Sequence, residues 1–105
     1  MRKVKITVLK KEFYPSLAKT YLSDKDEAGP CPLLKEGDTF LFHGEATMPK
    51  GFCPWAWIDI YSGVSALSAG ASYSPWYNRE GMEIACCTDG IRPVVFLLEA
   101  VKEDS

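Results

Sequence analysis

The chain has 105 residues, of which 47% are hydrophobic, 12% aromatic and 25% charged, and its formal charge at pH 7 is −2. A chain of this length forms one domain, residues 1–105, and is long enough to bury a core. The aromatic content argues against a disordered protein. Twelve Lys and Arg against fourteen Asp and Glu produce no field that favours nucleic acid or a membrane surface as partner.

The chain shows no targeting or membrane-spanning pattern. Its basic start runs into Lys10, Lys11 and Glu12 rather than into a long apolar run, so a secretory signal is not predicted. The longest uncharged stretch, residues 60–78, is rich in Ser and Gly and contains Pro75, which makes it too polar to span a bilayer. We therefore expect a cytoplasmic protein with reduced thiols.

The first half of the chain predicts two strands and a short helix. Residues 3–10 alternate between apolar and polar side chains, as a half-buried strand does. Pro15 suits the first position of a helix, since its missing N–H costs nothing there. That helix carries a narrow apolar stripe of Leu17, Ala18, Tyr21 and Leu22. Residues 39–43 predict a second strand, with Phe40 and Phe42 on one face.

The second half predicts a longer helix and a β-hairpin. Pro54 begins the helix, which we expect to run to about Ser62, with a weaker extension towards Gly70. Residues 83–87 and 93–101 flank Asp89-Gly90, a strong hairpin signal. The second arm is apolar on both faces, which predicts cover on both sides by helices or by another subunit. The element order predicts a compact α+β domain with a mixed or antiparallel sheet of four to five strands and two helices.

The four cysteines are the feature on which function depends. Cys53 precedes Pro54, and the unpaired N–H groups and positive dipole end of a helix N-terminus favour a reactive thiolate. The alternative is an ordinary buried cysteine. Cys86 and Cys87 are adjacent in a strand and point to opposite faces, so we expect Cys86, in phase with Ile84, in the core and Cys87 at a functional rim.

Three of these cysteines, Cys31, Cys53 and Cys87, are candidate ligands of a metal or redox cofactor. Soft thiolates favour zinc, copper(I) or an iron–sulfur centre. No Cys-x-x-Cys pair is present, so the fold must assemble the site, with His43 or Asp89 as further candidate ligands. Cys31 is held between Pro30 and Pro32. The alternative to a functional role is that this Pro-Cys-Pro segment only anchors a crossover connection.

Two alternatives to a metal centre stay open. The first is an enzyme that uses Cys53 as nucleophile, with Asp89 or Asp59 assisting in proton transfer. The only histidine, His43, is more typical of an exposed strand residue than of a catalytic base. The second alternative is a non-catalytic module that binds a small molecule or a partner, in which the cysteines pack.

Aromatic residues gather between Phe52 and Tyr77 and predict a binding pocket or a subunit contact. Trp55 and Trp57 lie about 200° apart on a helix, so they cannot both face the same layer. Trp55, Trp76 and Arg92 are the candidate ligand-binding residues, and Arg92 is expected to pair with Asp59 or with an anionic ligand. A homo-oligomer is the expected assembly.

The ordered set of short motifs resembles a family of small bacterial and archaeal single-domain proteins with no assigned activity. The motifs are Gly29-Pro30-Cys31-Pro32, Gly37-Asp38, Gly51-Phe52-Cys53, Pro75-Trp76 and Cys87-Thr88-Asp89 leading into Pro93-Val94-Val95-Phe96. The resemblance spans nearly the whole chain. It implies a single free-standing domain and marks Cys31, Cys53, Cys87 and Asp89 as motif positions, but it implies no reaction.

Overall fold

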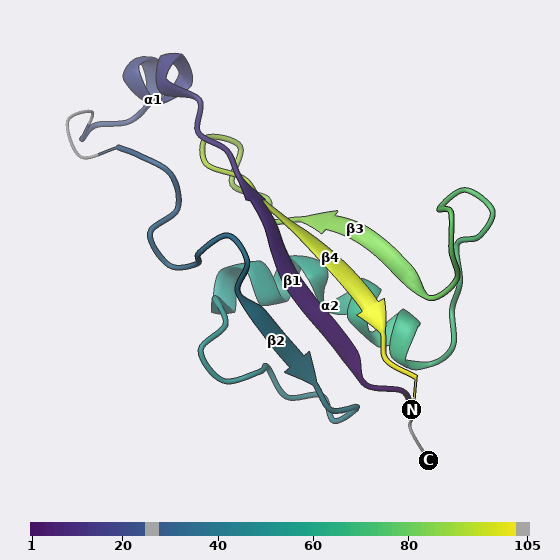
Figure 1. Ribbon diagram of the computed structural model, residues 1–105. Helices are drawn as coiled ribbons and strands as arrows, with labels where there is room; N and C mark the ends of the chain where they lie inside the picture. Colours follow the sequence, from purple (N-terminus) through teal and green to yellow (C-terminus); the bar gives the residue numbers. More distant parts are fainter. Residues whose placement is uncertain (25–27, 103–105) are drawn as a thin grey trace.

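A four-stranded antiparallel sheet with one long helix on one face forms the body of the protein (Figure 1). The computed structural model describes residues 1–24 and 28–102. The strands lie in the order β2-β1-β4-β3. The predicted α+β class is confirmed by six elements: β1 (Val4–Lys11), α1 (Pro15–Tyr21), β2 (Thr39–Phe42), α2 (Pro54–Ser68), β3 (Met82–Cys86) and β4 (Val94–Ala100).

The centre of the sheet follows from the alternation in β1. Val4, Ile6 and Val8 are at most 1% exposed and face α2. β1 pairs with β2 on one side and with β4 on the other. The register slips between Val8 and Lys10, and pairing with β4 then continues to Lys11. This strand is therefore the central support of the fold.

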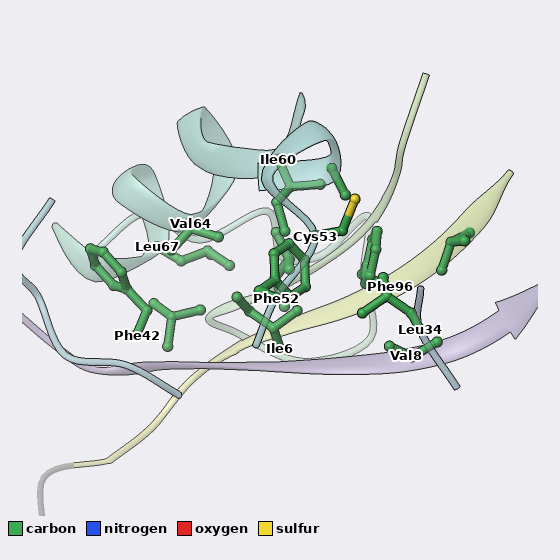
Figure 2. Packing of buried hydrophobic residues seen from close by; sticks show 14 residues of the cluster. Ile6, Val8, Leu34, Phe42, Phe52, Cys53, Ile60, Val64, Leu67 and Phe96 are labelled. Atoms are coloured by element: carbon green, nitrogen blue, oxygen red, sulfur yellow. The ribbon is translucent and has the colours of Figure 1, made fainter. Parts of the chain in front are cut away.

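Helix α2 covers one face of the sheet and includes most of the weaker extension expected beyond Ser62. Its inward side chains, Ile60, Val64 and Leu67, lie above Ile6 and Phe96 (Figure 2). The helix continues past Gly63 to Ser68 because the glycine lies where helix and sheet approach closely. A Cβ at Gly63 would come within 3.3 Å of the Leu98 side chain and would collide with the Glu83 carboxylate.

The opposite face of the sheet carries no helix in the part of the chain that the structure describes. Val94, Phe96 and Leu98 of β4 are buried against α2, whereas the alternate residues Val95 and Leu97 face away from it. The expectation that helices cover both faces of this strand is wrong for the described residues. Cover by a second subunit, and with it the homo-oligomer, stays a prediction.

The register of β3 overturns the prediction for Cys86. Glu83 and Ala85 pair with Leu98 and Phe96 and thus share the face that α2 covers. Ile84 and Cys86 consequently lie on the open face, where Cys86 is exposed. The two adjacent cysteines do point to opposite faces, as predicted, but Cys86 is the outer one.

Helix α1 lies at the far end of the molecule from the termini, beyond the sheet (Figure 1). Pro15 is its first residue, as predicted. Its apolar stripe is not a packing face, since Ala18 is its one buried residue and Leu17 and Tyr21 are 42% and 75% exposed. No helix among the described residues is long and apolar enough to cross a membrane.

Candidate functional site

A pocket of about 660 Å³ lies where the N-terminus of α2 meets two loops. Cys31, Cys53 and Cys87 all line it, so the fold brings the three predicted cysteines to one cavity. Residues 31–34 form one wall and the β3–β4 loop forms another. The remaining wall comes from Trp55 and Ala56 in the first turn of α2. We call this cavity the thiol pocket.

Cys53 is the N-cap of α2, as predicted. Its backbone is extended, with φ −74° and ψ 120°, and Pro54 follows as the first helical residue. Its carbonyl oxygen accepts a hydrogen bond from the Trp57 N–H at 2.9 Å, whereas its side chain caps no helical N–H. Cys53 as a whole residue is 9% exposed and belongs to the core cluster (Figure 2). Cys53 therefore stands at the boundary between core and pocket.

Cys87 closes the hairpin with both its backbone and its sulfur. Its N–H donates to the Val94 carbonyl at 3.1 Å, and the Val94 N–H donates to the Cys87 Sγ at 3.3 Å. The hairpin is thus confirmed, although its loop is longer than the Asp89-Gly90 pair. Cys31 and Cys87 are both half-buried and pack against the core. No cysteine in the described residues forms a disulfide.

Asp89 organises the loop that forms one wall of the pocket. Its Oδ1 accepts hydrogen bonds from the N–H groups of Ile91 at 2.9 Å and Arg92 at 3.1 Å. Its Oδ2 accepts a third from Arg92 Nε at 3.1 Å. Burial raises the pKa of Asp89, but these hydrogen bonds and the guanidinium charge outweigh burial and lower it overall. The carboxylate is ionised and already accepts three hydrogen bonds from its own loop, which suits a positioning role better than proton transfer.

Asp59 does not line the thiol pocket but ties it to α2. Its carboxylate accepts hydrogen bonds from the Thr88 N–H at 2.8 Å and from the Thr88 hydroxyl at 3.0 Å. The expected pair between Asp59 and Arg92 is wrong, because Arg92 bonds to Asp89 three residues away in the same loop. Sequence reasoning missed Thr88 as a partner, since a contact across 29 residues leaves no local pattern.

The two tryptophans of α2 divide as predicted. Trp55 is 74% exposed and lines the thiol pocket. Trp57 packs on Phe42 and Tyr61, with ring centroids 5.7 and 5.2 Å apart. Trp76 is 82% exposed, packs on Tyr77 with ring centroids 4.5 Å apart, and does not line the thiol pocket. The structure thus brings Trp55 to the site and leaves Trp76 outside it.

His43 and Leu33 differ from the predicted set of site residues: the first lies outside the thiol pocket and the second in its wall. His43 is exposed just after β2 and does not line the thiol pocket. Leu33 does line it while 66% exposed, and sequence reasoning missed it. The available signal was an apolar pair, Leu33-Leu34, directly after the stiff Pro-Cys-Pro segment. Within residues 1–24 and 28–102, no group of three His, Cys, Asp or Glu side chains is arranged to hold a metal ion.

Comparisons with known proteins assign no function to the thiol pocket. No family model matches the chain, and no curated protein or solved structure matches it either. The resemblance to the family of small bacterial and archaeal proteins accordingly stays a prediction.

Proposed function

We propose that the protein is a non-catalytic module that binds a small, largely apolar molecule in the thiol pocket. One observation carries the proposal: three segments far apart in the sequence place Cys31, Cys53 and Cys87 around one cavity of about 660 Å³. That volume lies within the range of roughly 300–1,000 Å³ typical of small-molecule sites.

The lining favours an apolar ligand. Apart from the thiols, most of the wall is hydrocarbon: Pro32, Leu33, Leu34, Ala56, Ile91 and Val94. Sulfur is polarisable, and an exposed indole offers a flat apolar surface with one hydrogen-bond donor. Trp55 and the thiols thus favour the body of an aromatic or alicyclic molecule over a strongly hydrated one.

The two other hypotheses of the sequence stay predictions. For a metal or redox cofactor, the described residues contain no group of three His, Cys, Asp or Glu side chains arranged to hold a metal ion, at Cys31, Cys53 and Cys87 or elsewhere. An enzyme that uses Cys53 as nucleophile needs a free base, and the carboxylate that lines the pocket, Asp89, is bound to its own loop and to Arg92.

Thiol alkylation tests the proposal with a control built into the chain. The neutral fluorophore N-phenyl-1-naphthylamine is added to the reduced protein, and iodoacetamide labelling of each cysteine is followed by mass spectrometry. We expect labelling of Cys31, Cys53 and Cys87 to slow roughly tenfold at ten times the probe's Kd, as occupancy predicts. Cys86, on the open face of the sheet, should label at an unchanged rate.

Two results would overturn the proposal. One is no protection of Cys31, Cys53 and Cys87, or equal protection of Cys86, at saturating probe. The other is a stoichiometric metal in protein purified without oxygen, measured by elemental analysis, together with loss of that metal on replacement of the three cysteines by serine. That second result would establish the metal centre instead.

A further inference from the structure

Arg92 is the one cationic side chain among the described residues that line the thiol pocket. Its guanidinium is only partly used by the protein. Nε donates to Asp89 Oδ2 at 3.1 Å, and within the described chain the two terminal nitrogens make no hydrogen bond. An arginine has five N–H donors in one plane, so four remain for another partner.

Asp89 fixes the position of the Arg92 guanidinium. Its carboxylate accepts hydrogen bonds from both the backbone N–H and the side-chain Nε of Arg92, so the arginine is held at its backbone and at its guanidinium. Asp89 also accepts a hydrogen bond from the Ile91 N–H, so three donors fix the orientation of the carboxylate that holds Arg92 Nε. The outer edge of the guanidinium, formed by Nη1 and Nη2, matches two oxygens of a carboxylate or a sulfonate.

The overall charge of the chain does not attract anions to the pocket. The chain carries a formal charge of −2, so its overall field does not draw them in. Any preference for an anion must therefore arise inside the pocket, where Arg92 is the one cationic side chain among the described lining residues and the N-terminus of α2 adds the positive end of its dipole. The apolar wall around Trp55 and Leu33 equally gives a small inorganic anion little to bind.

We propose that the ligand of the thiol pocket is an amphipathic organic acid, whose anionic group is held by the terminal nitrogens of Arg92 and whose apolar body lies against Trp55. This inference rests on the proposed function and narrows its substrate class. The residues act in binding, and no bond is made or broken.

A matched pair of probes separates the two claims. N-phenyl-1-naphthylamine is neutral, and 1-anilinonaphthalene-8-sulfonate has the same ring skeleton with one sulfonate. Fluorescence titration yields a Kd for each, and the ratio of anionic to neutral Kd reports the contribution of the charge alone. This ratio cancels changes in pocket shape that weaken both probes together.

Replacement of Arg92 is the decisive change. In Arg92→Gln we expect the ratio to rise roughly tenfold or more, the loss typical of a hydrogen bond to a charged group. Arg92→Lys keeps the charge but not the planar edge, and should raise the ratio by a smaller factor. Arg79→Gln is the control, because Arg79 pairs with Glu99 at 3.0 Å and does not line the thiol pocket, so the ratio should stay unchanged.

The outcomes distinguish the two levels of the proposal. A ratio that stays unchanged in both Arg92→Gln and Arg92→Lys, with the neutral probe still bound, overturns anion recognition and leaves the binding pocket intact. If neither probe binds the unmodified protein nor protects its pocket cysteines, the proposed function itself fails.

Discussion

The layer between α2 and the sheet is closed under the C-terminal half of the helix and open at its N-terminus. In the closed part, Val64 and Leu67 pack in one cluster with Ile6 and Leu98, and all four side chains are 0% exposed. At the N-terminus the same layer is bounded by the thiol pocket. Figure 2 shows the packed side chains, with Cys53 among them close to Ile60. The contrast teaches that the candidate site occupies the place where helix and sheet stop touching.

The closed part should carry most of the stability, and Phe96→Ala tests this with the largest expected effect. Phe96 is 0% exposed and its ring centroid lies 5.4 Å from that of Phe52. Deleting a buried phenylalanine ring costs about 3–5 kcal/mol of unfolding free energy. Urea denaturation measures the loss. Trp76→Ala, at an 82% exposed position, is the control and should change stability by less than about 0.5 kcal/mol.

The close approach of helix and sheet at Gly63 belongs to the closed part, and Gly63→Val should force the two apart. The added side chain must displace Leu98 and the Glu83 carboxylate, at a cost of about 1–3 kcal/mol by overpacking. Ser62→Val, one residue earlier on the exposed side, introduces the same β-branched residue without that clash. If both variants lose equal stability by urea denaturation, the close approach is not what limits position 63.

The tie between Asp59 and Thr88 holds the pocket loop to α2, so its removal should act on the open part. A double-mutant cycle of Asp59→Ala and Thr88→Val is expected to show a coupling of about 1 kcal/mol, a typical net value for hydrogen bonds. Binding of N-phenyl-1-naphthylamine should weaken in each single variant. A coupling near zero would mean that Thr88 is held by other contacts.

Two carboxylates whose pKa values are shifted in opposite directions, those of Glu83 and Asp89, should give opposite, small pH effects on stability. Burial raises the pKa of Glu83 above its ordinary value, so its ionised form destabilises the folded state near neutral pH. Glu83→Gln should therefore stabilise the protein at pH 7, and the gain should vanish as the pH falls below about 4.

The counterpart of Glu83 is Asp89, whose pKa is lowered overall. Its contribution is present above its unfolded pKa and is lost as the pH falls through the lower folded pKa. Asp89→Asn should thus destabilise at pH 7, and the effect should shrink as the pH falls below about 4, the ordinary range of an aspartate pKa. Urea denaturation at pH 3, 5 and 7 checks both variants. Stability changes of the same sign at pH 7 in Glu83→Gln and Asp89→Asn would contradict the opposite pKa shifts of the two carboxylates.

Local patterns were enough for much of the fold. The alternation of Val4, Ile6 and Val8 and the placement of Pro54 after Cys53 each specify an element through neighbours in the chain. The candidate site was also partly predictable, since Cys31, Cys53 and Cys87 each lie next to a proline or a tight turn. Whether α2 continues past Gly63 could not be decided from the sequence. The close approach of this glycine to Glu83 of β3 and Leu98 of β4 joins segments that are far apart in the chain.

By itself, the sequence determined the strands, the start of α2 and the opposite orientation of Cys86 and Cys87, because strand and helix periods depend only on adjacent residues. The tertiary structure alone decided which of the two cysteines faces α2, since one face of β3 is chosen by its register with β4. It also decided that Arg92 bonds to Asp89 and Asp59 to Thr88. Such pairings depend on how separate segments meet in space, which no spacing along the chain records.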